Sequence, residues 1–168
     1  MVAGLIGVAL SCLALPAQKP DDDPVKKLSA FVGKWQSEGT FENGTKARSD
    51  LECRWSPQNR YVVCEQDVRL SSGHSHQLTI YGYDDKSGKY TYATFPDNGA
   101  RPVTGTLENK GNFWAYDATV VDSIKPTEVR TTNEFTTPKT EVFKVYLSND
   151  HGATWKTMLQ GTATKVSD

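Results

Sequence analysis

The chain has 168 residues, with 19 basic and 20 acidic side chains, a net charge of −1 and 37% hydrophobic residues. This length suits one domain that can bury a core without metal ions or many disulfides. Charges of both signs are interspersed and form no basic stripe, so nucleic acid is not an expected partner.

Residues 2–17 are apolar or small and carry no charge. A transmembrane helix needs about 20 such residues, so this run is too short to span a bilayer. It predicts instead a secretory signal peptide over residues 1–17, followed by a polar linker over 18–24. A lipoprotein signal with lipidated Cys12 is one alternative, and a buried N-terminal helix is another. We therefore expect an exported protein, periplasmic or extracellular, with its folded domain over residues 25–168 and no transmembrane segment.

A short amphipathic helix is predicted over Val25–Val32, because Val25, Leu28, Phe31 and Val32 fall on one side. Pro24 suits the first turn of such a helix. We expect this segment to cap one end of the domain.

Ten short segments of alternating polarity, separated by turn signals, then fill the chain. The predicted strands cover residues 34–42, 47–55, 61–70, 76–83, 89–95, 102–108, 112–121, 127–135, 139–148 and 155–166. Consecutive hairpins of this kind predict an all-β fold, a single antiparallel up-and-down β-barrel whose closure removes exposed edges. A two-sheet sandwich is the alternative.

Cys53 and Cys64 flank a predicted tight turn at Gln58-Asn59, which places them opposite each other on neighbouring strands. Directly opposed positions bring side chains close enough for a bridge, and export permits one. We predict a Cys53–Cys64 disulfide, with a pair of reduced core thiols as the alternative.

Residues 148–155, Ser-Asn-Asp-His-Gly-Ala-Thr-Trp, match the Asp-box pattern of a hairpin turn, and we interpret them as structural. His74 and His76 would share a face of a strand and could hold a metal ion with Asp67 or Glu65. Solvated loop histidines are the simpler interpretation, so no metal site is predicted.

Several motifs resemble one known family. They are Leu28-x-x-Phe31-Val32-Gly33-x-Trp35, Glu52-Cys53-x-Trp55, Gly82-Tyr83-Asp84 and the Asp box. Over about residues 25–166 the chain resembles exported bacterial lipocalin-like proteins of the calycin superfamily, of the domain-of-unknown-function-1579 type. The resemblance implies a ten-stranded barrel with a small internal cavity and no agreed chemistry.

The Gly-x-Trp start also gives a distant similarity to haem-binding barrels of the nitrobindin type. Those barrels bind haem through a histidine on a late strand. The last strands here, 141–147 and 155–166, contain none, so we expect no haem and no other cofactor.

The leading functional hypothesis is a barrel that binds a small apolar or amphipathic molecule, since such pockets are mostly apolar with few polar anchors. The predicted ligand-binding residues are Trp35, Phe41, Trp55, Val62, Tyr92, Arg130 and Phe143. The expected lining also includes Leu51, Val68, Leu78, Ile80 and Val145. An inward Arg130 with tyrosine hydroxyls would suit a carboxylate, whereas a solvated strand face is the simpler interpretation of Arg130.

Two other hypotheses remain open. An enzyme on the same scaffold would use inward polar groups, for which Asp117, His76 and Tyr92 are the candidates. An envelope protein that binds a protein partner would need an exposed aromatic patch such as Tyr81, Tyr83 and Trp114. The sequence leaves the ligand, any catalytic activity and the oligomeric state open.

Overall fold

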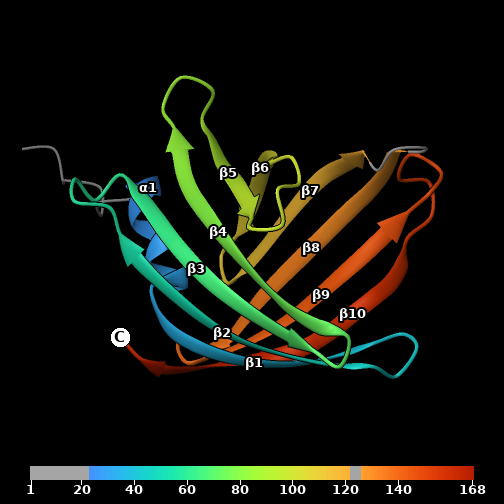
Figure 1. Ribbon diagram of the computed structural model, residues 1–168. Coiled ribbons are helices and arrows are strands. Elements are labelled where there is room, and N and C mark those ends of the chain that lie inside the picture. The colour runs from blue at the N-terminus through green and yellow to red at the C-terminus, as the bar shows by residue number, and fades with distance from the viewer. Residues whose placement is uncertain (1–22, 122–125) are drawn as a thin grey trace, which may run out of the picture.

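The computed structural model describes residues 23–121 and 126–168 and shows a barrel of ten antiparallel strands (Figure 1). The elements are α1 (Pro24–Lys27), the 3-10 helix η1 (Leu28–Phe31), β1 (Gly33–Phe41), β2 (Lys46–Trp55), β3 (Tyr61–Leu70), β4 (Gly73–Asp84), β5 (Lys89–Pro96), β6 (Val103–Lys110), β7 (Phe113–Val121), β8 (Pro126–Thr137), β9 (Thr140–Ser148) and β10 (Lys156–Ser167). The predicted single β-barrel is confirmed, with strand ends shifted by a few residues.

Each strand pairs with its neighbours in sequence, and β1 pairs with β10 to close the barrel. Within the ladder between these two strands, Gly39 lies opposite Gly161. A Cβ at Gly161 would lie 2.2 Å from the carbonyl oxygen of Glu38 and 2.6 Å from the Phe143 ring. Glycine is therefore required at Gly161 by the close approach of the two strands.

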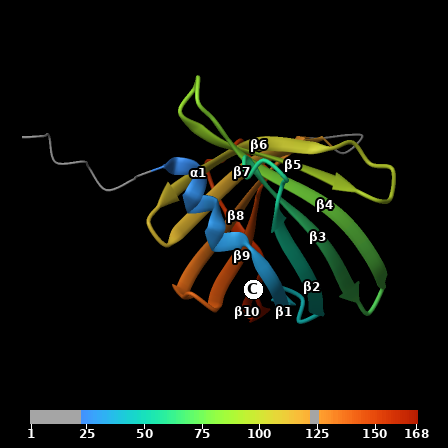
Figure 2. The same cartoon turned by 90° about the vertical axis from the view of Figure 1, so that its left-hand side faces the viewer.

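The N-terminal segment closes one end of the barrel, which confirms the predicted cap (Figure 2). The Asp23 side chain accepts a hydrogen bond from the backbone of Val25 at 3.0 Å, and Pro24 occupies the first turn. Leu28 is fully buried and Phe31 is 5% exposed. The helix is thus fixed at its start by a side-chain cap and along its length by burial.

Aromatic rings pack around Phe31 at this closed end. The Phe31 ring stacks on Tyr81 with centroids 4.7 Å apart, and it meets Trp114 and Phe135 at 5.1 and 5.6 Å. Trp35 donates its indole N–H to the carbonyl oxygen of Phe31 at 2.9 Å. These contacts join the helix to strands from all around the barrel, so the closed end is the core of the protein.

The predicted disulfide is present. Cys53 lies opposite Cys64 in the β2–β3 ladder, the two sulfur atoms are bonded, and both residues are buried. The intervening turn contains Asn59 in the left-handed region at φ 53°, a conformation that asparagine tolerates. The bridge therefore joins two strands that the hairpin already holds in register.

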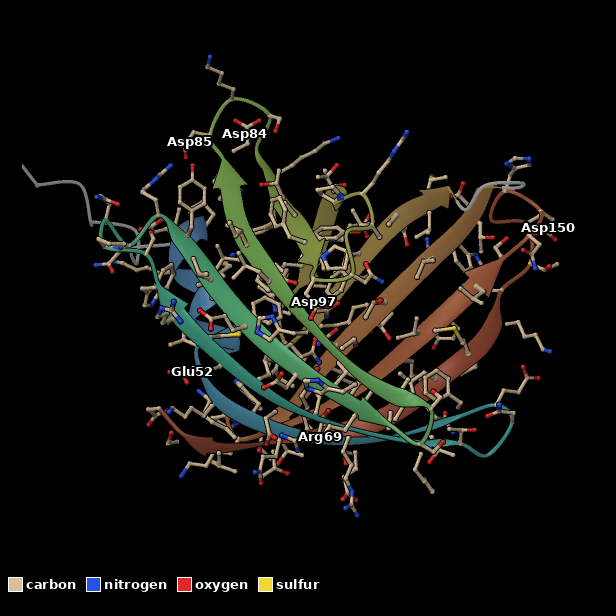
Figure 3. All side chains as sticks on the ribbon, in the orientation of Figure 1. Glu52, Arg69, Asp84, Asp85, Asp97 and Asp150 are labelled. Atoms are coloured by element: carbon tan, nitrogen blue, oxygen red, sulfur yellow. A yellow bond between two sulfur atoms is a disulfide. The ribbon has the colours of Figure 1, made fainter. Side chains whose placement is uncertain are left out.

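The Asp box forms the β9–β10 turn at the opposite end of the barrel, where Figure 3 labels Asp150 far from α1. One Asp150 carboxylate oxygen accepts the backbone N–H of Thr154 at 2.9 Å, and the other accepts the Thr154 hydroxyl. The Ser148 hydroxyl donates to Asp150 at 2.6 Å. Trp155 lies beneath Gly152, so the box is a structural turn, as predicted.

The expected inward direction of Leu78 and Ile80 is wrong, and the aromatic patch that an interaction protein would need is absent from the described residues. Leu78 and Ile80 lie on the outer face, because β4 pairs with β3 through Cys64 and Thr79 and so turns Thr79 and Tyr81 inward. Tyr81, Tyr83 and Trp114 form no exposed patch, since Trp114 is 1% exposed and both tyrosines pack against the core.

The predicted signal peptide and Cys12 lie outside the described residues. Within the part of the chain that the structure describes, no helix is long and apolar enough to cross a membrane.

Candidate ligand-binding cavity

A cavity of about 420 Å³ occupies the interior of the barrel. Its floor at the closed end includes Phe31 and Trp35. Its lining extends to Val120, which is 36% exposed near the opposite end of the barrel. This volume lies in the range of pockets that hold small organic ligands.

Every strand contributes at least one inward aliphatic or aromatic side chain to the lining. The apolar members from the middle of the barrel are Leu51, Val68, Ala118, Val129, Phe143, Val145, Leu159 and Ala163. They follow from strict alternation, because the residues between them face solvent. Most of the cavity wall is therefore suited to an apolar ligand body.

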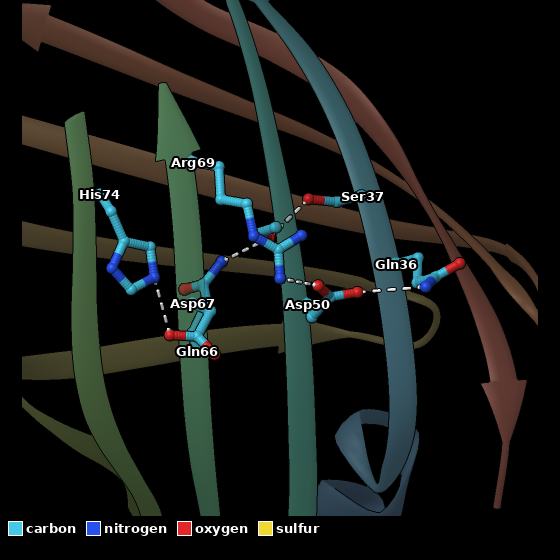
Figure 4. Close-up of polar contacts among 8 residues, drawn as sticks. Gln36, Ser37, Asp50, Gln66, Asp67, Arg69 and His74 are labelled. Carbon is cyan, nitrogen blue, oxygen red and sulfur yellow. Dashed lines mark hydrogen bonds and ion pairs between the residues drawn. The ribbon is translucent and has the colours of Figure 1, made fainter. Parts of the chain in front are cut away.

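A first polar group crosses β1 to β4 on one wall. The hydroxyls of Ser37 and Ser49 share a hydrogen bond of 2.7 Å, and Gln66 donates its amide to Ser49 at 3.0 Å (Figure 4). Gln77 in turn donates to the Gln66 carbonyl at 2.6 Å. These four side chains line the cavity and bond to one another, which lowers the cost of placing polar groups inside.

A second polar group lies nearer the closed end and contains a carboxyl group. Tyr116 on β7 donates its hydroxyl to the Asn133 carbonyl oxygen on β8 at 2.5 Å, and the Asn133 amide donates to Oε1 of Glu141 on β9. Glu141 is 7% exposed, and all three residues line the cavity. A chain of two hydrogen bonds thus ends on a buried carboxyl group.

Burial sets the protonation of these groups. It raises the pKa of Glu141 to about 7, although the bond from Asn133 acts in the opposite direction. Burial also raises the pKa values of the Tyr81 and Tyr116 hydroxyls well above their ordinary value, and that of Tyr92 to about 12. Glu141 is therefore the group in this cavity whose charge changes near neutral pH.

The structure brings three of the predicted ligand-binding residues to the cavity wall, namely Trp35, Tyr92 and Phe143. Val62 is fully buried in the core beside the disulfide, and Trp55 packs against the same core. Phe41 is half-buried at the end of β1. These last three lie outside the set of described residues that line the cavity.

Arg130 requires a correction, because its side chain lies on the outer surface. Residues 129 and 131 on either side of it line the cavity, so the strand turns Arg130 outward. There it forms a two-bond ion pair with Asp117, another outward residue, at 2.7 and 2.8 Å. The expected inward guanidinium for a carboxylate ligand is thus not provided by Arg130.

His74 and His76 lie on β4, beside outer polar contacts that extend over β1 to β3 (Figure 4). Arg69 donates to Asp50 at 2.5 Å, Asp50 accepts from Gln36, and His74 bonds to Asp67 at 3.1 Å. His76 lies opposite Asp67 in the ladder. Among the described residues, no group of three or more His, Cys, Asp or Glu side chains is placed to hold a metal ion.

Sequence reasoning missed Glu141, Asn133 and Gln66. The available signal was alternation, since Glu141 shares a face with Phe143 and Val145, which were both assigned to the interior. Likewise Asn133 shares a face with Val129 and Phe135, opposite to the charged face of β8. A polar residue in phase with inward apolar residues is a candidate for a buried polar group.

Comparison with known proteins places this geometry in context. The family model described as "Protein of unknown function (DUF1579)" matches residues 22–165. A search of curated proteins finds none that matches the sequence.

Several solved structures are similar to this chain at low sequence identity. The S-type phycobiliprotein lyase CPES from Guillardia theta has a TM-score of 0.51 at 14% identity, over 85% of this chain and 91% of that one. The structure of EF1p2_mFAP2b bound to DFHBI has a TM-score of 0.47 at 13% identity, over 84% and 98% of the two chains. A fluorescence-activating β-barrel designed de novo has a TM-score of 0.44 at 12% identity, over 82% and 94%.

Proposed function

This chain belongs to the DUF1579 family, whose function is unknown, and from that premise we propose that it is a binding protein for a small amphipathic molecule held inside its barrel. The observation that carries the proposal is the cavity of about 420 Å³. Its walls are mostly apolar, with polar side chains gathered in two hydrogen-bonded groups. This composition is typical of sites that hold an apolar body and orient one polar end.

The proposal includes export. A disulfide fits an oxidising compartment, and the apolar run over residues 2–17 has the composition of a secretory signal. We propose residues 1–17 as the signal peptide, 18–24 as the linker and 25–168 as the binding domain. The ligand would then be encountered in the periplasm or outside the cell.

An interaction protein and an enzyme receive less support. The aromatic residues that an outer patch would need pack against the core, and Trp114 is buried. Asp117 and His76 face away from the cavity. Of the enzyme candidates, Tyr92 lines the cavity, where its hydroxyl donates to the backbone oxygen of Asp117 at 3.2 Å.

The first experiment is native mass spectrometry of the protein purified from the export compartment of its own host, beside a denatured control. We expect a discrete additional mass that is lost on denaturation. A protein that carries no additional mass and also binds no amphipathic compound in titration would contradict the proposal.

Two variants of one strand make the test specific to the cavity. Ala118→Phe places a ring into the lining, whereas Ala115→Phe places the same ring on the outer face of β7. We expect Ala118→Phe to lose the bound mass and Ala115→Phe to keep it, with both folded by circular dichroism. Equal retention by both variants would show that the ligand binds elsewhere.

A further inference from the structure

Glu141 places a buried carboxyl group in the wall of a mostly apolar cavity, where few hydrogen-bond donors reach it. Its Oε1 accepts one hydrogen bond, from the Asn133 amide. Among the described residues, no side chain donates to its second oxygen, Oε2. A buried ionised carboxylate with a single neutral donor is poorly compensated, so the site has capacity for a further donor or a positive charge.

Each hydrogen bond in this group donates toward Glu141, so the carboxyl group remains able to accept another. The Tyr116 hydroxyl donates a hydrogen bond to the Asn133 carbonyl oxygen, and the Asn133 amide donates one to Oε1 of Glu141. Tyrosine has one O–H donor, and the bond to Asn133 uses it. The chain of bonds therefore ends on a carboxyl acceptor in the cavity wall, which favours a ligand group that donates a hydrogen bond.

The charges around the site do not already supply a partner. Among the described residues that line the cavity, Arg48 is the single cation, and its guanidinium pairs with Glu38 at 3.0 Å on the outer surface. On β10, Lys165 lies over the Trp35 ring at 5.1 Å from its centroid and pairs with Asp168 at 3.4 Å. Tyr81 and Tyr116 interact electrostatically with Glu141, and Tyr92 interacts with both tyrosines; burial keeps all three hydroxyls neutral up to high pH.

Aromatic rings surround the same part of the cavity. The Tyr116 ring has its centroid 6.3 Å from that of Tyr81 and 5.5 Å from that of Tyr92, and all three line the cavity. The faces of aromatic rings attract cations, and rings beside a carboxylate are a recurrent way to bind an ammonium group. Rings and carboxyl group thus favour the same ligand chemistry.

We propose, on the basis of the binding function above, that the ligand carries a protonated amine or ammonium head that binds at Glu141 beside the Tyr81 and Tyr116 rings, with its apolar body along the rest of the cavity. An anionic head would meet the carboxylate with the same sign of charge. A neutral alcohol would donate one hydrogen bond without compensating the charge.

The test uses three probes with the same ten-carbon chain, decylamine, decanol and decanoate, titrated calorimetrically into the intact protein below their aggregation concentrations. At pH 8 we expect decylamine to bind roughly ten- to a hundredfold more tightly than decanol, as a charge-assisted hydrogen bond implies. We expect decanoate to bind most weakly. The affinity for decylamine rises between pH 6 and 8 as Glu141 ionises, while that for decanol does not rise.

The matched variants are Glu141→Gln, which keeps the shape of the side chain, and Glu134→Gln on the exposed outer face of β8. We expect Glu141→Gln to lose the preference for decylamine while it still binds decanol, and Glu134→Gln to behave as the unchanged protein. If Glu141→Gln does not fold, the probe series with the unchanged protein decides alone.

The outcomes separate this inference from the function on which it rests. Binding of all three probes with equal affinity, or strongest binding of decanoate, overturns the amine specificity but leaves an amphipathic binding site. Failure of all three probes to bind, together with a clean mass spectrum, overturns both. A decylamine preference that survives in Glu141→Gln overturns the assignment to Glu141.

Discussion

The guanidinium of Arg130 lies over the indole of Trp155, with its central carbon 4.6 Å from the ring centroid. The same guanidinium makes two hydrogen bonds to Asp117 on β7. Arg130 therefore connects β7 and β8 to the Asp-box turn between β9 and β10. Arg130, which the sequence predicted as a ligand-binding residue, instead stabilises the outer surface at the end of the barrel opposite the helix.

This placement predicts that Arg130→Met lowers the free energy of unfolding by about 1–2 kcal/mol, as a surface ion pair and a cation–π contact together imply. The measurement is urea unfolding at neutral pH. Arg54→Met is the control, because Arg54 makes an exposed ion pair with Glu65 at 2.8 Å and has no described ring contact. Equal losses in the two variants would contradict a contribution from Trp155.

Removal of the Cys53–Cys64 bridge is expected to lower the free energy of unfolding. The bridge closes a loop with a sequence separation of 11, for which the chain-entropy relation gives about 3 kcal/mol. We expect the double variant Cys53→Ala, Cys64→Ala to have a free energy of unfolding lower by that amount, and so to unfold at a lower urea concentration. A reducing agent should destabilise only the unchanged protein. The prediction fails if reduction leaves the unfolding midpoint of the unchanged protein in place.

The Asp-box carboxylate predicts a change in stability at acid pH. Hydrogen bonds from Ser148 and Thr154 lower the pKa of Asp150 to about 2, below the ordinary value of about 3.9 for an unfolded chain. Their contribution is present above the unfolded pKa and is lost as the pH falls through about 4 toward 2. We expect the difference in melting temperature between the unchanged protein and Asp150→Asn to shrink over this interval.

The control for that experiment is Asp97→Asn, because Asp97 is exposed on the β5–β6 turn. Its melting temperature should follow that of the unchanged protein across the same pH range. A constant difference between Asp150→Asn and the unchanged protein from about pH 5 to pH 2 would show that ionisation of Asp150 does not contribute.

Glu141 predicts the opposite dependence in the empty barrel. Its pKa of about 7 in the folded protein lies above the ordinary carboxyl value, so the folded state holds the proton more tightly than the unfolded chain does. The contribution of Glu141 to stability is then complete below about pH 4 to 5 and is lost as the pH rises through 7. The full shift corresponds to a loss of up to about 3 kcal/mol.

Glu141→Gln removes this loss. We expect the variant to be more stable than the unchanged protein at pH 8 and similar at pH 4.5, measured by urea unfolding without ligand. Glu134→Gln should leave the pH dependence as it is. A Glu141→Gln variant that is less stable than the unchanged protein at pH 8 would show that the carboxylate is better compensated than its contacts indicate.

Much of the fold followed from periodicity and turn chemistry. Alternation placed Trp35 and Cys53 correctly on the inner face, and the turn at Gln58-Asn59 established the register that joins Cys53 to Cys64. These positions were predictable because one face of each strand is clearly apolar, and a shift of one residue would expose all of it.

Alternation was misleading where the barrel interior is polar. On β4 the inward residues are Gln77, Thr79 and Tyr81, while Leu78 and Ile80 face outward. A rule that assigns apolar residues to the interior therefore assigns the inner and outer faces of β4 the wrong way round. Tyr81 could be placed only with knowledge of Phe31, whose ring covers it from the N-terminal segment.

The N-terminal cap also gives the barrel a direction. The Tyr90 hydroxyl donates to the carbonyl oxygen of Pro24 at 3.0 Å, and Leu28 is fully buried, so the chain that precedes Asp23 joins the barrel at its closed end. The two ends of the barrel therefore differ: the aromatic floor lies where the described chain begins, and the Asp-box turn lies at the other end.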